Sequence, residues 1–334
     1  KNMIHVFDDF THLQRVILGD INLGLLNHVN PLYQSQIEDI FHETISDLNA
    51  MQRIFEDLDI EVYRPVIKES HSKAIETPYW RENGIRNALS PRDSFAVIGN
   101  TLLEAASHKR SAHFEDLYYK ELFVKLFKEG AQWVSMPKPS LEDSDFDNDD
   151  YLNNLQPILD TAQIARLGDK LLISTSGAGN KMGVEWIQRH FGNRFDIVVM
   201  DPCFSGHMDA QVKIIRPGLI VSPYPKEKHP DFMQSWEIIP TQIFGTAPEI
   251  VDTELQDDDW DNTYFQSSML SYDENTVFVF EHYKKLYPDF IKLLERKGVD
   301  CVFLPFTHQY WFSQGSTCIT CDLNRAGSFE DYAQ

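Results

Sequence analysis

The feature that most constrains the fold of this chain is a strand–strand–helix–strand pattern that recurs along it. In residues 95–105, FAVIGNTLLEA, we predict two short strands around a Gly99-Asn100 turn. Apolar residues at helical spacing follow in residues 114–130, which end at a glycine. Residues 131–137, AQWVSMP, then have the pattern of a strand closed by proline. Together they predict one ββαβ module.

The same order recurs three more times toward the C-terminus. The hairpin turns of these copies are predicted at Gly168-Asp169, Pro217-Gly218 and residues 273–275. The second of these copies has only a poor, short helix around residues 230–234. The helix of the third carries an internal proline, Pro288, so we expect it to be kinked or to start late.

The two ends of the chain supply a fifth copy. Residues 317–323 (TCITCDL) and 15–19 (RVILG) can pair as its hairpin, an amphipathic pattern over residues 37–58 predicts its helix, and IEVYRP its last strand. Such modules cannot each bury an apolar face alone, so five should pack radially into one closed α/β domain spanning residues 1–334. The pattern leaves one alternative open, a two-domain α/β protein in which these similarities are accidental.

Composition and charge argue against several classes of function. A net charge of −21 disfavours non-specific binding to nucleic acid or to an anionic membrane, and is compatible with a cationic small substrate. No apolar run reaches the length of a membrane span, and the first residues lack the features of a signal or transit peptide. Four cysteines without framework spacing indicate free thiols in a reducing compartment, so we expect a cytoplasmic protein.

Residues that can carry chemistry precede or lie within the predicted hairpins. In a radial assembly these positions converge on the axis. They are Asp93, Asp160, His207, Asp209 and Cys318. Attack on an amidinium or guanidinium carbon needs a thiolate nucleophile, a histidine to move protons, and carboxylates to orient the histidine and hold the cation. Each residue alone is weak evidence, because a lone Asp before a strand is usually a cap and a lone His is usually structural.

Five stretches resemble a known family. They are SPRDSFAVIGNTLLEA, LDTAQIARLGDKLLIS, GVEWIQRHF, HMDAQVKIIRPGLIVS and CITCDLNRAGSFEDY. In this order they are similar to the amidinotransferases, which include the arginine:glycine and arginine:inosamine-phosphate enzymes and belong to the pentein superfamily of five-fold α/β propellers. The similarity runs from about residue 10 to residue 332. It implies the same five-fold architecture as the repeat.

The resemblance also implies roles for individual residues. Cys318 matches the catalytic cysteine, His207 the histidine of the H-[ILM]-D-A motif, and Asp160 the aspartate that orients this histidine. The substrate-binding residues that it implies are Asp93 and Arg92 of the P-R-D motif and Asp209.

The implied reaction moves the amidino group of L-arginine to an amine acceptor through an amidino-cysteine intermediate. It requires no metal and no organic cofactor. The expected partners are small molecules rather than nucleic acid or membrane, and a homodimer is left open. Two competing interpretations remain: a deiminase or dihydrolase of the same superfamily, in which water replaces the acceptor, and a non-catalytic binding protein on the same scaffold.

The C-x-x-C pair of Cys318 and Cys321 raises the question of a paired role for the two sulfurs. A zinc site would need a second ligand pair, but Cys203 and Cys301 are isolated in the sequence. Residues three apart on a strand point to opposite faces. We therefore expect Cys321 to be a strand neighbour, with Cys318 as the one working sulfur.

The chain departs from the family near the acceptor and donor sites. Phe204 and Gly206 stand where the glycine-using enzymes carry Asn and Met, and resemble the amidinotransferases of cyanobacterial alkaloid-toxin biosynthesis. They imply a larger acceptor and a role in secondary metabolism. Lys226 falls where the family has an arginine that binds the donor α-carboxylate. A lysine there cannot make the bidentate contact that an arginine makes. Residues 266–268 depart from the family's Ser-x-Asn pattern.

The first prediction concerns the acceptor pocket. Replacing Gly206 by Met should impair reaction with the native acceptor more than arginine cleavage, because Asp93 and Asp209 hold the donor guanidinium. The two half-reactions can be followed separately as ornithine release and as formation of the new guanidine. An equal fall in both would contradict the assignment of this position to the acceptor pocket.

Overall fold

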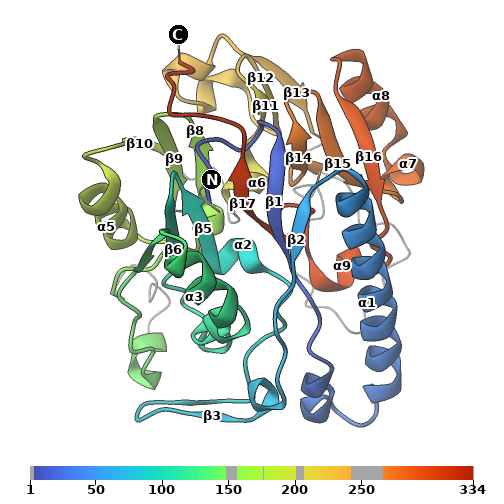
Figure 1. Ribbon diagram of the computed structural model, residues 1–334, viewed down its shortest axis with the longest axis vertical. Helices are drawn as coiled ribbons and strands as arrows, with labels where there is room; N and C mark the ends of the chain where they lie inside the picture. The colour runs from blue at the N-terminus through green and yellow to red at the C-terminus, as the bar shows by residue number, and fades with distance from the viewer. Residues whose placement is uncertain (1–3, 148–155, 176, 201–206, 242–265, 334) are drawn as a thin grey trace.

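The computed structural model describes residues 4–147, 156–175, 177–200, 207–241 and 266–333. Five three-stranded sheets follow one another around the described part of the chain, together with a small two-stranded sheet (Figure 1). In each three-stranded sheet an antiparallel hairpin comes first, and its second strand pairs in parallel with a third. This arrangement confirms the α/β class and the five-fold ββαβ repeat. The single domain spanning residues 1–334 stays a prediction.

The strands fall where the repeat predicts them. The five sheets are β17–β1–β2 (Thr320–Arg325, Leu13–Leu18, Glu61–Tyr63), β5–β6–β7 (Phe95–Ile98, Thr101–Glu104, Gln132–Ser135), β8–β9–β10 (Ile164–Leu167, Lys170–Ser174, Asp196–Met200), β11–β12–β13 (Lys213–Arg216, Leu219–Ser222, Glu237–Pro240) and β14–β15–β16 (Leu270–Asp273, Thr276–Phe280, Asp300–Leu304). The small sheet pairs β3 (Ile75–Glu76) with β4 (Arg81–Glu82).

Helices connect the hairpins to their third strands. They are α1 (Gln34–Asp57), α3 (Lys120–Lys128), α5 (Lys181–Phe191), the pair α7 (Tyr283–Leu286) and α8 (Pro288–Arg296), and, in the β11–β13 module, only short 3₁₀ turns that include η8 (Asp231–Met233). The late start predicted for the last helix is confirmed, because α8 begins at Pro288, where the missing N–H costs nothing. The poor helix around residues 230–234 is likewise a single 3₁₀ turn.

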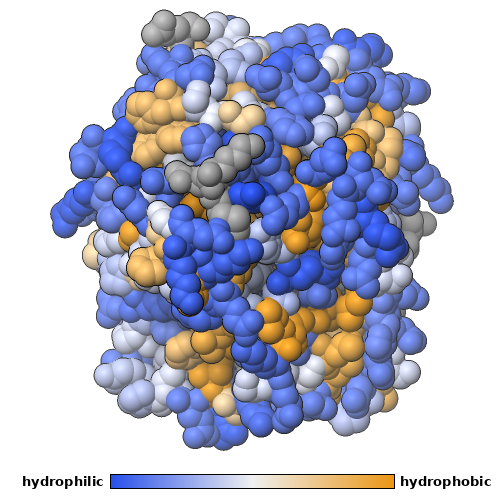
Figure 2. Space-filling view, in the orientation of Figure 1, coloured by the Kyte–Doolittle hydropathy of each residue, from blue (hydrophilic) through white to orange (hydrophobic). Residues whose placement is uncertain are grey.

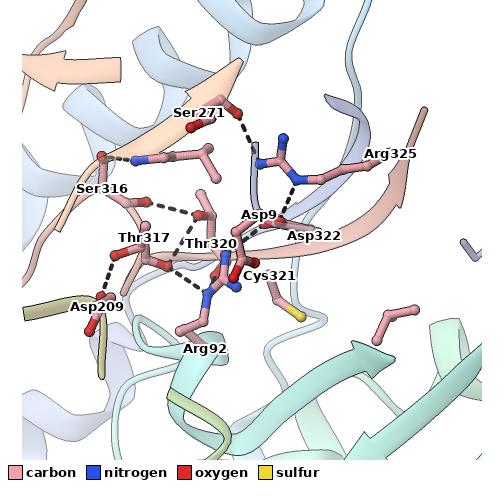
Figure 3. Close-up of polar contacts among 12 residues, drawn as sticks. Asp9, Arg92, Asp209, Ser271, Ser316, Thr317, Thr320, Cys321, Asp322 and Arg325 are labelled. Carbon is pink, nitrogen blue, oxygen red and sulfur yellow. Dashed lines mark hydrogen bonds and ion pairs between the residues drawn. The ribbon is translucent and has the colours of Figure 1, made fainter. Parts of the chain in front are cut away.

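Charged side chains occupy the centre of the assembly (Figure 3). Asp322 of β17 is 1% exposed and pairs with Arg92 at 2.6 Å, Arg325 at 2.6 Å and Arg166 at 3.1 Å. Burial disfavours the charged carboxylate, but the three guanidinium groups still hold the pKa of Asp322 well below its usual range. Arg166 lies on β8, so this network links the module formed by the chain ends to another module.

The outer surface is mainly polar. Figure 2 shows one face on which hydrophilic residues separate the apolar patches. Large apolar side chains that are exposed include Leu32, Tyr79 and Phe127. No helix in the described ranges combines the length and the apolarity needed to cross a membrane.

The second prediction compares two glycines at equivalent hairpin turns. Gly168 and Gly218 both have positive φ, +66° and +88°, so Ala should cost about 1 kcal/mol at either site. A Cβ at Gly168 would also lie 2.0 Å from the Glu330 carbonyl oxygen, whereas a Cβ at Gly218 meets nothing within 4 Å. Gly168→Ala should therefore lower the free energy of unfolding by at least about 1 kcal/mol more than Gly218→Ala. Urea unfolding checks this. Equal losses of unfolding free energy in the two variants would show that the segment around Glu330 does not restrict this turn.

Candidate active site

Short turns that precede hairpins bring the predicted residues together. Asp93 lies in α2 (Pro91–Ser94), directly before β5, and Asp160 is the N-cap of η6 (Thr161–Gln163), directly before β8. His207 is the N-cap of α6 (Met208–Gln211), which precedes β11. Aspartate at an N-cap usually accepts a backbone hydrogen bond, but Asp160 makes no such bond. Its carboxylate faces His207 instead.

His207 lies between two carboxylates. Its Nδ1 is 3.6 Å from Asp93 Oδ1 and its Nε2 is 3.4 Å from Asp160 Oδ2. Burial disfavours the imidazolium, yet Asp93, Asp160 and Asp209 together raise the pKa of His207 to about 9. Burial likewise opposes ionisation of Asp160, but the positive charge of His207 beside it keeps the pKa of this carboxyl below the usual value. The ring is therefore an imidazolium at neutral pH, able to give a proton.

The same three side chains bear on the question of a metal. Potential ligand atoms of Asp93, Asp160 and His207 lie within 4.8 Å of one another. Both ring nitrogens lie at ion-pair distance from a carboxylate. This arrangement suits an acid/base set, in which the carboxylates orient the imidazole and stabilise its protonated form.

Cys318 lies in a turn and not on a strand, which corrects the sequence-based expectation. The strand β17 begins only at Thr320, after the turn that holds Cys318. The Cys318 Sγ is 3.6 Å from Asp209 Oδ2 and 3.5 Å from Ser268 Oγ. Burial, Asp209 and Asp93 together raise the pKa of the thiol far above its usual range. The cysteine is therefore a neutral thiol in the unliganded site.

Two hydroxyl groups fix the carboxylate of Asp209 beside this sulfur. Ser268 Oγ donates to Asp209 Oδ2 at 2.9 Å, and Thr317 Oγ1 donates to the same oxygen. Sequence reasoning missed Thr317, and it noted Ser268 only as part of a departure from the family pattern. Gly315 is the sequence feature that could have indicated a close contact near the cysteine, because a Cβ there would lie 2.0 Å from Ser268 Oγ. The close approach of the cysteine turn to Ser268 thus requires glycine.

Arg92 is buried and contacts the turn that carries Cys318. Its Nε donates to the carbonyl oxygens of Thr317 at 3.3 Å and Thr320 at 3.2 Å, and its Nη2 pairs with Asp322. Figure 3 shows the guanidinium turned into this internal network. Arg92 therefore supports the cysteine turn from inside the molecule, and its role in substrate binding stays a prediction.

Cys321 lies in surroundings unlike those of Cys318. It is fully buried, its Sγ donates to the Phe95 carbonyl at 3.3 Å, and in Figure 3 it points away from Asp209 and Thr317. The separation of the two sulfurs arises from the turn before β17. The contacts of Cys321 are those of a packed core residue.

Three further residues were predicted to contact the donor or the acceptor. Phe204 and Gly206 lie outside the described residues, as does Cys203. Lys226 is exposed in the 3₁₀ turn η7 (Lys226–Lys228), which follows β12. Their roles at the donor and acceptor sites stay predictions.

Comparison with known proteins decides the family. No family model matches the chain. Inosamine-phosphate amidinotransferase 1 of Streptomyces glaucescens is 30% identical over 305 residues, which cover 88% of this chain and 83% of the relative. The L-arginine:L-lysine amidinotransferase of Pseudomonas savastanoi pv. phaseolicola is 28% identical over 302 residues, 86% of this chain and 80% of the relative. The chain belongs to the amidinotransferase family.

Solved amidinotransferase structures show the same fold. The inosamine-phosphate amidinotransferase of Streptomyces griseus superposes with a TM-score of 0.83 at 27% identity, over 100% of both chains. A Microseira wollei amidinotransferase of the saxitoxin biosynthetic pathway gives a TM-score of 0.83 at 24% identity, over 99% of both chains. The five-fold α/β architecture is therefore that of the family, and the chain is an amidinotransferase enzyme.

The third prediction separates the two cysteines of the C-x-x-C pair. Cys318→Ala should abolish amidino transfer, because it removes the sulfur beside Asp209. Cys321→Ala should keep most activity and lose some stability, because it empties a packed core position. Activity assays together with thermal unfolding check this. Equal loss of activity in two folded variants would point back to a paired role for the sulfurs.

Proposed function

We propose that this amidinotransferase moves the amidino group of L-arginine to an amine acceptor through an amidino adduct on Cys318. The observation that carries the proposal is the convergence of a buried thiol, an imidazolium and three carboxylates on one site. With His207 protonated, Asp93, Asp160 and Asp209 leave the site negatively charged. A guanidinium, which pairs with carboxylates through several N–H groups, fits this charge.

Binding of the donor supplies the nucleophile. The thiol is neutral in the free site because burial and the carboxylates Asp209 and Asp93 oppose the thiolate. A guanidinium bound by the same two carboxylates offsets one of their two negative charges and places a positive charge beside Cys318. Both effects lower the pKa of the thiol, so its proton is released to solvent as the donor binds.

The imidazolium then drives departure of the first product. The Cys318 thiolate forms a bond to the guanidinium carbon, and the bond from that carbon to the ornithine Nδ breaks. His207 gives its proton to this nitrogen, which leaves as the amine of ornithine. Neutral His207 next takes a proton from the acceptor amine as that amine attacks the same carbon, and the C–S bond breaks to release the thiolate. Nucleophile and acid/base group are thus restored.

The acceptor is proposed to be larger than glycine and to belong to secondary metabolism. The argument rests on Phe204 and Gly206 and on the relatives, whose names specify inosamine-phosphate and lysine acceptors. Lys226 is proposed to meet the donor carboxylate as a point charge. We propose further that residues 1–334 act as one catalytic domain.

The fourth prediction tests the two-stage route. Arginine alone should give about one equivalent of ornithine per enzyme, together with a protein heavier by one amidino group on the peptide that contains Cys318. An amine acceptor should then discharge the adduct as a new guanidine. Rapid quench and intact-protein mass spectrometry measure both steps.

A matched variant sharpens this experiment. In His207→Gln the acid that protonates the leaving nitrogen is absent, so the burst of ornithine should slow by at least about a hundredfold. Continuous citrulline from arginine without any amine would replace the proposal with a deiminase. Continuous ornithine with urea would replace it with an amidinohydrolase.

A further inference from the structure

An arginine that sequence reasoning did not single out contacts the predicted donor carboxylate. Arg86 Nη1 lies 3.3 Å from Asp93 Oδ2, while Asp93 Oδ1 faces His207 at 3.6 Å. The two oxygens of one carboxylate therefore face two different cations. The side chain of Arg86 is 19% exposed, so water screens this contact only partly.

A second carboxylate holds Arg86 in this place. Glu115, at the start of η4 (Glu115–Tyr118), is 1% exposed and contacts Arg86 through Nε at 2.9 Å and Nη2 at 2.8 Å. Ser94 Oγ donates to the same Glu115 oxygen at 2.6 Å, and Ser94 directly follows Asp93. The fork of Arg86 thus spans two carboxylates, a geometry that a lysine cannot reproduce.

These contacts form one line of alternating charge that includes His207, the proposed acid/base residue. It runs from Glu115 through Arg86, Asp93 and His207 to Asp160. We propose that Arg86, anchored by Glu115, is a positioning residue that fixes Asp93 and limits how firmly His207 keeps its proton. The part of this inference that concerns the donor rests on the proposed function.

Arg86 and Glu115 carry opposite charges, so removing one or the other should shift the pKa of His207 in opposite directions. Arg86→Gln leaves the charge of Asp93 opposed by His207 alone, so the imidazolium is stabilised and its pKa rises. Glu115→Gln leaves the charge of Arg86 opposed only by the site carboxylates Asp93 and Asp160, so the imidazolium is stabilised less and its pKa falls. Each shift should be about one unit, as expected for the loss of one nearby charge.

The other groups around His207 stay in place in both variants. Asp160 faces it from the N-cap of η6, and Asp209 faces it from α6. His108, which follows β6, interacts unfavourably with the imidazolium. Because these groups are common to every variant, a difference in the His207 pKa reports the change at Arg86 or Glu115.

The fifth prediction is tested by titrating His207 in the unliganded full chain. Nitrogen-15 NMR of labelled histidine follows the ring, and His207→Gln identifies its signal. Arg86→Gln should raise the pKa by about one unit, Glu115→Gln should lower it by about one, and Arg86→Lys should leave it near the wild-type value because the charge is kept. The matched control is Arg110→Gln, since Arg110 is 20% exposed and pairs at 2.8 Å with Asp143, outside this line.

The signs of the shifts decide the outcome. Unchanged or same-direction shifts in Arg86→Gln and Glu115→Gln would overturn the inference, because a purely structural role moves stability alone. If Arg86→Gln does not fold, the downward shift in Glu115→Gln and the wild-type value in Arg86→Lys decide the matter. The titration needs no turnover, so its result is independent of whether the wild-type enzyme forms the amidino adduct.

For the donor, kinetics gives a separate measure. Glu115→Gln should raise the KM for arginine at least about tenfold with a smaller change in kcat, because an uncompensated Arg86 competes for Asp93. Arg110→Gln should change neither. A fall in kcat at constant KM would contradict the effect on donor binding.

Discussion

The buried carboxylate of Asp322 is the point on which the rest of the molecule depends. Three arginines, Arg92, Arg166 and Arg325, reach it from α2, β8 and its own strand. A buried carboxylate that loses its partners costs several kcal/mol, so the sheets that carry these arginines must close around β17 together. Because β17 pairs with β1 from the opposite end of the chain, this charge network also joins both chain ends to the modules of α2 and β8.

The catalytic geometry follows from the same network. Arg92 binds the carbonyl oxygens of Thr317 and Thr320 while it pairs with Asp322. The turn between these two threonines carries Cys318, so these bonds help to fix the position of the proposed nucleophile. The carboxylates around His207 and Cys318 explain the protonation states of both side chains, since negative charge favours the imidazolium of His207 and opposes the thiolate of Cys318. In the proposed mechanism, a bound cationic donor reverses the second effect when the thiolate is needed.

Much of the fold could be predicted from the sequence because it depends on local periodicity. Paired strands around glycine turns, the amphipathic α1 and the late start of α8 at Pro288 are all properties of contiguous residues. The residues that meet at His207 could be predicted as well, because each stands just before a hairpin and the repeat brings such positions to one axis. The turn conformation at Cys318 could not, since C-x-x-C fits both a strand and a turn.

The sequence by itself determined the five ββαβ modules and indicated the family, and it placed a cysteine, a histidine and three aspartates at or before the hairpins as the proposed site. Only the tertiary structure decided which way the side chains face. It turned Arg92 into the core, placed Ser268 and Thr317 on Asp209, and put Arg86 and Glu115 behind Asp93. These contacts join segments far apart in the chain, and they are selected by the need to pair charges away from water. Periodicity does not encode such pairings.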